Sequence, residues 1–151
     1  MEEAKPNMLI RNVTVGDLDP IIAIDKQISG MEKSAYWHDA YAEYQRHQDS
    51  RFFLIAERDR EVLGFIVGEI RAWEFGSEPC GWVFAIGVKE DSVLSGIGSE
   101  LLDNLCDCFK RQGVGKVRTM TAKQEHELLS FFRSQGMMAG PYLQLEKDLN
   151  V

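Results

Sequence analysis

The spacing of apolar and polar residues divides this chain into alternating strand-like and helix-like stretches. Strict alternation and short apolar runs are typical of strands. Two apolar runs separated by the polar turn 58–61 also predict a hairpin. The predicted strands are 8–15, 52–57, 62–73, 82–88, 116–121, and one or two in the tail 137–149, which Gly140-Pro141 interrupts.

Four other stretches repeat their apolar residues every three or four positions, which is the spacing of an amphipathic helix. We expect Asp17 to cap the first of them and Gly30 to end it. Gly136 is placed to end the last. The predicted helices are 17–28, 35–48, 96–111 and 125–135.

The predicted order is strand, two helices, three strands, helix, strand, helix and a last strand or two. A helix between the strand 82–88 and the strand 116–121 is a parallel crossover, whereas the hairpin is antiparallel. The chain is therefore expected to be an α/β (α+β) protein with a mixed sheet. Its 151 residues contain no evident linker or repeat, so we expect a single domain over 1–151.

A glycine turn, Ser95-Gly96-Ile97-Gly98, stands between the strand 82–88 and the long helix. Glycines let a ligand approach the backbone, and a helix N-terminus offers free N–H groups and a positive dipole end. The combination predicts a pocket for a phosphate or pyrophosphate. A turn of this kind alone is more often structural, and the flanking strand and helix favour the binding role.

Composition narrows the class of partner. The net charge of −7 argues against nucleic acid and is compatible with a cationic amine acceptor. No apolar run is long enough to span a membrane, and the N-terminus lacks the core of a signal peptide. Three cysteines argue against a disulfide framework, so we expect buried thiols in a reducing cytoplasm, with Cys106 and Cys108 unable to form a metal site.

Nearly the whole chain resembles the GNAT superfamily of acyl-CoA-dependent N-acetyltransferases. The resemblance rests on the opening IRNVTVGDLDPI, the three-strand meander, the strand-turn-helix segment 88–102 and the closing FFRSQGM. It implies a GNAT-like fold with a mixed, mostly antiparallel central sheet, splayed between strands 4 and 5 and flanked by about four helices. It also implies acetyl-CoA as the acyl donor, with no metal.

In this family the pyrophosphate lies on the amides of the glycine turn, and the pantetheine arm pairs with the preceding strand. The leading Gln or Arg of the family signature is replaced here by Val93, and Ser95 stands where Arg is common. Backbone amides and a Ser95 or Ser99 hydroxyl would then carry the contact. The implied cofactor-binding residues are Ile86, Gly87, Val88, Ser95, Gly96, Ile97, Gly98, Ser99 and Phe132.

The positions that carry ionisable catalytic groups in many relatives hold Phe132, Met120 and Trp82 here. An ammonium must lose its proton before it attacks a thioester, and a base acting through water assists this step. We therefore consider Glu69 or Glu78 as the base and Tyr142 as the acid. Each has a simpler interpretation as a surface or packing residue. The backbone N–H of Val88 is the candidate oxyanion donor.

The expected function is acetyl-CoA-dependent N-acetyltransfer to a primary amine, by direct attack on the thioester. The resemblance to small single-domain bacterial members favours a protein lysine as acceptor. A small-molecule amine is the alternative acceptor, and a non-catalytic acyl-CoA-binding module is the alternative class. The chain is expected to be a monomer or a homodimer.

Overall fold

The computed structural model describes residues 8–92 and 95–150, and the chain divides into two compact units, Met1–Met120 and Thr121–Val151. Short 3-10 turns at Val15–Asp17, Glu74–Gly76 and Glu90–Ser92 connect elements of the first unit. The regular elements of the first unit are β1 (Met8–Asn12), α1 (Leu18–Ser29), α2 (Ser34–Arg46), β2 (Arg51–Arg58), β3 (Glu61–Arg71), β4 (Cys80–Val88), α3 (Ile97–Arg111) and β5 (Val117–Thr119).

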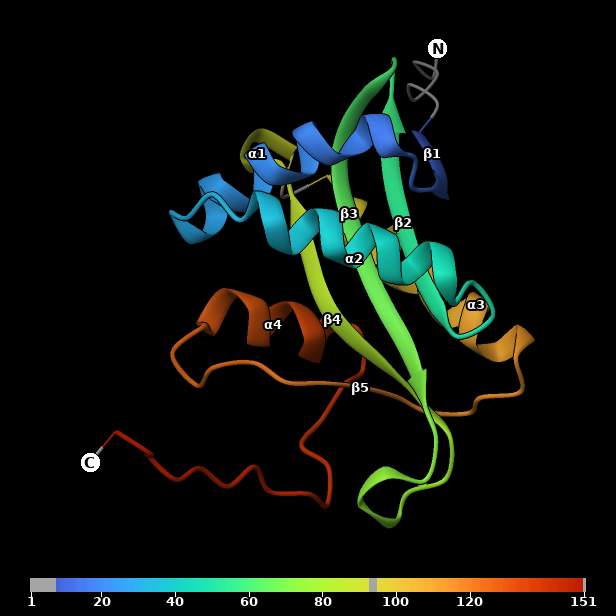
Figure 1. Ribbon diagram of the computed structural model, residues 1–151, viewed down its shortest axis with the longest axis vertical. Helices are drawn as coiled ribbons and strands as arrows, with labels where there is room; N and C mark the ends of the chain where they lie inside the picture. Colours follow the sequence, from blue (N-terminus) through green and yellow to red (C-terminus); the bar gives the residue numbers. More distant parts are fainter. Residues whose placement is uncertain (1–7, 93–94, 151) are drawn as a thin grey trace. The chain divides into compact units, whose positions relative to one another are not determined.

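One five-stranded sheet, in the order β1-β2-β3-β4-β5, runs through the first unit (Figure 1). The pairs from β1 to β4 are antiparallel, and β5 lies parallel to β4, as the crossover helix α3 requires. β5 pairs with Gly81, Trp82 and Val83 only, so the two strands part beyond Val83. The predicted mixed, mostly antiparallel sheet with a splay between strands 4 and 5 is confirmed.

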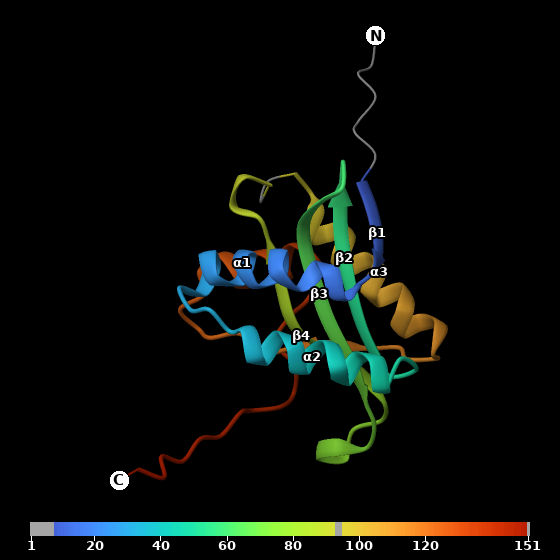
Figure 2. The same cartoon turned by 45° about the horizontal axis from the view of Figure 1, so that its top comes forward.

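Helices α1 and α2 cover one face of the sheet, which we call the α1/α2 face, and α3 covers the other (Figures 1 and 2). On the α1/α2 face, the Trp37 ring of α2 lies edge-on to Phe65 at 4.9 Å and tilted to Phe53 at 5.9 Å. All three side chains are at most 2% exposed. The predicted apolar stripe of α3 is buried too, since Leu101 and Leu105 are 0% exposed.

An ion-pair cluster at Arg11 ties β1 to β2 and to the start of α1. The Arg11 guanidinium donates to both Asp17 oxygens, at 2.7 and 2.8 Å, and to Glu57 at 2.7 Å. Asp17 also accepts from the Thr14 backbone N–H. Asp17 occupies the N-cap position of α1 but makes no capping hydrogen bond there, so the expected cap is wrong. Its carboxylate closes the preceding turn instead.

We expect Asp17→Asn to lower the free energy of unfolding by about 2–3 kcal/mol at pH 7, because Arg11 would lose a largely buried partner. Burial raises the pKa of Asp17, but the hydrogen bonds from Arg11 and Thr14 outweigh it and hold the pKa below its usual 3.8. That stability is present above the unfolded pKa and lost as pH falls through the folded one. Urea unfolding from pH 7 to pH 2 should show the two proteins converging below about pH 4. A pH-independent difference would contradict this.

Most predicted elements are found, with small shifts at their ends. β1 stops at Asn12 rather than at residue 15, because the chain turns there toward α1. Gly30 ends α1 in the left-handed conformation, as expected. No helix in the part of the chain that the structure describes has both the length and the apolar character to cross a membrane.

The second unit contains α4 (His126–Ser134), which Gly136 follows with φ of 87°. Residues 137–150 have no regular secondary structure, so the expected last strand or strands are wrong for this stretch. Its large side chains Met138, Leu143, Leu145 and Leu149 are 83–89% exposed. A strand needs a neighbour that pairs with its backbone groups, and the described residues of this stretch form no strand ladder. The expectation of one domain over 1–151 stays a prediction.

Candidate active site

The glycine turn and the start of α3 form the first part of the site. Gly96 has φ of 81° and ψ of 8°, a left-handed conformation that favours glycine, and a Cβ there would meet no atom within 4 Å. Backbone conformation, rather than space, thus explains the glycine. α3 has no side-chain cap hydrogen bond within the described residues, so the backbone N–H groups of Ile97 and Gly98 in its first turn are placed to bind an anion. Val93 and Leu94 lie outside the described residues.

The side chains of this turn contribute less than the sequence suggests. The Ser95 hydroxyl donates to the Ser92 carbonyl at 2.5 Å, so its proton is used in a hydrogen bond within the loop and not for a ligand. The Ile97 side chain is 0% exposed and packs in the core, which leaves only its backbone for a ligand. Ser99 is the third residue of α3 and half-buried. The turn is therefore mainly a backbone cradle.

The far edge of β4 forms the second part. The Lys89 N–H donates to Leu63 on β3 at 2.8 Å, so strand alternation directs the N–H and C=O groups of Val88 and Ile86 away from β3. β5 ends before it could pair with them. These groups are therefore placed to bind an extended ligand. Gly87 has another role, since a Cβ there would lie 2.6 Å from the Phe65 ring.

An irregularity in β4 marks the centre of this strand. Val83 pairs with Gly68 and Ala85 with Val67, so Phe84 is an extra residue in the β3–β4 ladder. Such a bulge bends a strand and re-aims its side chains. The Phe84 ring is 41% exposed, and the Arg71 guanidinium lies 5.1 Å above its centre. The bulge lies where β4 parts from β5.

Glu69 lies beside this bulge, on the α1/α2 face. It pairs with Arg51 across β2 and with Trp82 across β4. Its Oε2 lies 2.6 Å from Arg51 Nη2 and its Oε1 3.7 Å from Arg71 Nε. The 2.6 Å contact lacks hydrogen-bond alignment, so it is an ion pair without a directed bond. The Glu69 side chain is only 18% exposed.

The other predicted catalytic residues belong to other segments of the chain. Glu78 is exposed, two residues before β4 begins and therefore at the opposite end of β4 from Val88. Tyr142 and Phe132 belong to the second unit, where Phe132 is buried on α4 and Tyr142 lies in the tail. Met120 is 67% exposed and Trp82 half-buried. Glu69 is thus the one proposed carboxylate that the structure places at the bulge.

Sequence reasoning missed three residues around Glu69: Arg51, Arg71 and Phe84. Two arginines at the ends of apolar runs were visible in the sequence. Arg71 is two residues from Glu69 on the same face of β3, whereas the approach of Arg51 and Phe84 depends on the pairing register of β2 and β4 with β3, which the sequence did not supply. The bulge at Phe84 had no sequence signal.

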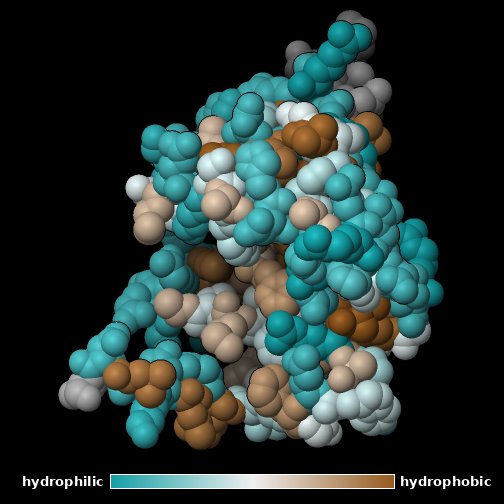
Figure 3. Space-filling view, viewed as in Figure 1, coloured by the Kyte–Doolittle hydropathy of each residue, from teal (hydrophilic) through white to brown (hydrophobic). Residues whose placement is uncertain are grey.

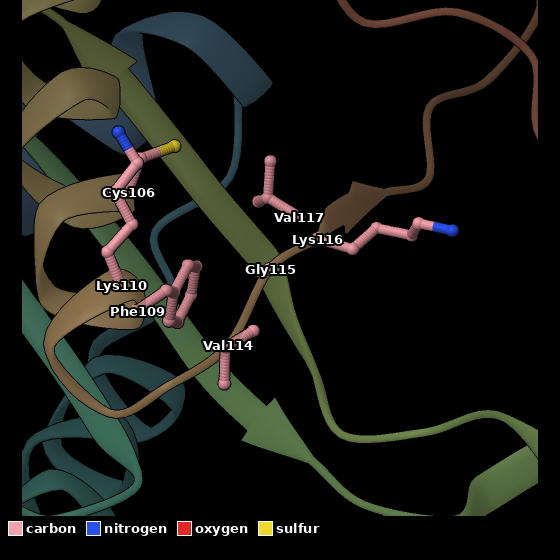
Figure 4. A pocket seen from close by; sticks show the side chains of 7 residues that line it. All are labelled: Cys106, Phe109, Lys110, Val114, Gly115, Lys116 and Val117. Atoms are coloured by element: carbon pink, nitrogen blue, oxygen red, sulfur yellow. The ribbon is translucent and has the colours of Figure 1, made fainter.

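A small pocket of about 120 Å³ lies away from the glycine turn, between the C-terminal half of α3 and the start of β5 (Figure 4). Cys106 lines it, with Phe109, two lysines and two valines. Burial, and then Asp103, raises the pKa of the Cys106 thiol, which disfavours the reactive thiolate. Cys106 and Cys108 are only half-buried, so the expectation of buried thiols is confirmed for Cys80 alone. The described residues contain no group of three metal-ligating side chains.

Comparisons with known proteins agree with this geometry. Residues 19–137 match the model of a family described as the acetyltransferase (GNAT) family. A search of curated protein sequences gives no match.

Solved structures share the fold at low sequence identity. A transcriptional regulator from Bacillus halodurans C-125 has a TM-score of 0.80 and 18% identity, over 95% of this chain and 100% of that one. Glucosamine-6-phosphate N-acetyltransferase from Arabidopsis thaliana has 0.74 and 17%, over 95% and 99%. Aminoglycoside N-acetyltransferase AAC(6')-Iy in complex with CoA has 0.81 and 18%, over 99% of both chains. At such identities the likeness establishes the fold and not the substrate.

Proposed function

This chain belongs to the GNAT acetyltransferase family, and from that premise we propose that it moves the acetyl group of acetyl-CoA to a primary amine. The observation that carries the proposal is a pair of backbone surfaces in the first unit. They are the start of α3, which has no side-chain cap, and the edge of β4 at Ile86 and Val88, with which no described strand pairs. An anion-binding helix end beside a free strand edge suits a ligand with a pyrophosphate and an extended amide arm.

We assign the pyrophosphate to the N–H groups of Ile97 and Gly98, and the pantetheine arm to the edge of β4; Ser99 remains a predicted contact of the cofactor. The CoA complex of a structural neighbour supports acetyl-CoA as the donor. The Ser95 hydroxyl is left out of this contact because it donates to Ser92. Phe132 and Gly87 remain predicted contacts of the cofactor.

The transfer needs an uncharged amine. A lysine-like ammonium, with a pKa of about 10.4 in water, gives up its proton, and the nitrogen then attacks the thioester carbon. The N–C bond forms, the C–S bond breaks, and the CoA thiolate takes up a proton. We propose Glu69 as the base, through water, because it lies beside the β4 bulge. Val88 N–H is the proposed oxyanion donor.

Two classes of acceptor are open to such a site. We favour a protein lysine, and the net charge of −7 supports a basic partner. The alternative is a small amine, which is the kind of acceptor that the names of two structural neighbours indicate for those proteins. Tyr142 remains the proposed acid for the thiolate.

Single-turnover mass spectrometry with labelled acetyl-CoA tests the activity and the acceptor together. The enzyme is offered a lysine-rich protein mixture, an aminoglycoside and an amino-sugar phosphate in separate reactions. We expect label on protein lysines at a rate well above a no-enzyme control. Label on a small amine alone would overturn the lysine assignment. CoA binding with no label on any amine would overturn the proposed acetyl transfer.

A further inference from the structure

The guanidinium of Arg71 lies over the aromatic ring at the β4 bulge. It is 5.1 Å from the centre of the Phe84 ring, a distance at which a ring face attracts a cation. Arg71 Nη1 also donates to Glu74 Oε2 at 3.2 Å, and Arg71 Nε lies 3.7 Å from Glu69 Oε1. Figure 3 shows the α1/α2 face, on which hydrophobic and hydrophilic side chains are mixed. One ring face and two carboxylates thus surround a single positive charge.

This guanidinium is held loosely. Its Nε is buried and makes no hydrogen bond to any described residue, although a buried donor without a partner is destabilising. The 3.7 Å contact with Glu69 is too long for a hydrogen bond, and the Glu74 side chain that accepts from Nη1 is 51% exposed. Ion pairs of exposed groups contribute little to stability. Another cation can therefore displace Arg71 at small cost.

The two carboxylate oxygens of Glu69 have different partners. Oε2 lies 2.6 Å from Arg51 Nη2, whereas Oε1 has Arg71 Nε at 3.7 Å. Because Oε2 is already in close contact with Arg51, Oε1 is the oxygen left to take up a proton if Glu69 is the base. The guanidinium next to it is a donor only and accepts no proton. Proton transfer to Oε1 therefore requires Arg71 to move away.

An acceptor amine reaches this site as a cation. A lysine-like ammonium has a pKa of about 10.4 in water, so nearly all of it is protonated at neutral pH. The groups beside the proposed base that attract a cation are the ones that surround Arg71, namely the ring face of Phe84 and the carboxylates of Glu69 and Glu74. The acceptor and Arg71 therefore compete for the same position.

We infer that Arg71 occupies the position of the acceptor cation in the free enzyme and is displaced when a protonated amine binds. The inference rests on the proposed acetyl transfer and adds a basis for acceptor specificity. Displacement frees Glu69 Oε1, so the amine that binds also exposes the base that deprotonates it. An uncharged molecule of the same shape gains nothing from the carboxylates and leaves Arg71 in place. The site is therefore selective for amines that arrive protonated.

Nuclear magnetic resonance of the isotope-labelled full chain, with CoA present, tests the displacement. The Arg71 Nε–H signal is assigned by its loss in the variant Arg71→Gln. The probe is n-butylammonium, which copies the lysine side chain, and n-butanol is its uncharged counterpart. Saturation with n-butylammonium should raise the exchange of the Nε proton with water about 10-fold, because the buried Nε becomes exposed. Saturation with n-butanol should leave that exchange unchanged.

Matched variants measure the competition in the same titration. Arg71→Gln should bind n-butylammonium about 10-fold more tightly than wild type, because the internal competitor is removed. Arg60→Gln is the control and should bind as wild type does, since Arg60 is exposed in the turn between β2 and β3, at the other end of β3. Phe84→Leu added to Arg71→Gln should remove most of the gain, because the cation loses the ring face. Circular dichroism verifies that each variant is folded.

Three results would overturn the inference. Slow exchange of the Arg71 Nε proton at saturating amine would show that the acceptor binds without moving Arg71. Equal or weaker binding of the amine by Arg71→Gln, or no binding by either protein, would show that the two cations do not compete. An equal response to n-butanol would show that charge does not drive the displacement. None of these measurements involves acetyl transfer, so their failure is distinguishable from a failure of the labelling experiment.

Discussion

Glu69→Gln is expected to lower kcat by about 100-fold to 1,000-fold, because it removes the proposed base and keeps the size of the side chain. Glutamine cannot accept the amine proton. Steady-state kinetics with the chosen amine, measured side by side for wild type and variant, would show the loss of kcat.

Glu78→Gln is the matched control for this experiment. Glu78 is exposed and lies before the start of β4, so its substitution should change kcat less than about twofold. Glu69→Gln leaves Arg51 without its ion-pair partner, and a thermal melt with a CoA-binding measurement therefore accompanies the kinetics. A Glu69→Gln enzyme that binds CoA and keeps full activity would show the base assignment to be wrong.

Gly81→Ala is expected to lower the free energy of unfolding by about 3 kcal/mol, with a fall in Tm of roughly 6–12 °C. A Cβ at Gly81 would lie 2.3–2.7 Å from atoms of the Phe109 ring. The ring is 2% exposed and packs edge-on against Phe52, so it cannot move aside easily. Gly81 also holds β4 to β5 through its N–H bond to Lys116. Calorimetry would measure the loss.

Two further variants test whether the loss of stability in Gly81→Ala arises from contact with the Phe109 ring. Phe109→Leu in the Gly81→Ala background should recover part of the stability, which an additive pair of mutations would not do. Gly115→Ala serves as the control, because a Cβ there meets nothing within 4 Å and its φ is not positive. It should change stability by less than about 0.5 kcal/mol. A fully stable Gly81→Ala protein would contradict the packing of α3 on the sheet.

Much of the fold could be predicted because its signals are local. The β2–β3 hairpin followed from two apolar runs around a polar turn, and α3 from its apolar spacing. Asp17 is a residue for which the prediction from local sequence was wrong. Its place before a helix indicated a cap, whereas its carboxylate binds Arg11 across the β1 end. The tail likewise has a strand pattern, and a pattern does not provide the neighbour that a strand needs.

The candidate site also has one part that the local sequence predicted and one part that it did not. The turn at Gly96 and the strand before it were evident from neighbouring residues, since a phosphate cradle is built from consecutive backbone groups. The setting of Glu69 depended on residues 18 positions apart. Arg51 reaches it only through the pairing of β2 with β3, and the β4 bulge beside it adds one residue for which the sequence had no signal.

The sequence by itself determined the order of elements, the glycine turn and the family resemblance, because these depend on spacing along a few turns of backbone. The tertiary structure alone decided which edge of β4 is free and which carboxylate lies at its bulge. It also decided which aromatic rings pack against the two glycines of β4. Those features arise from contacts between residues distant in the chain. One residue of register moves every side chain to the other face, so no local pattern can fix them.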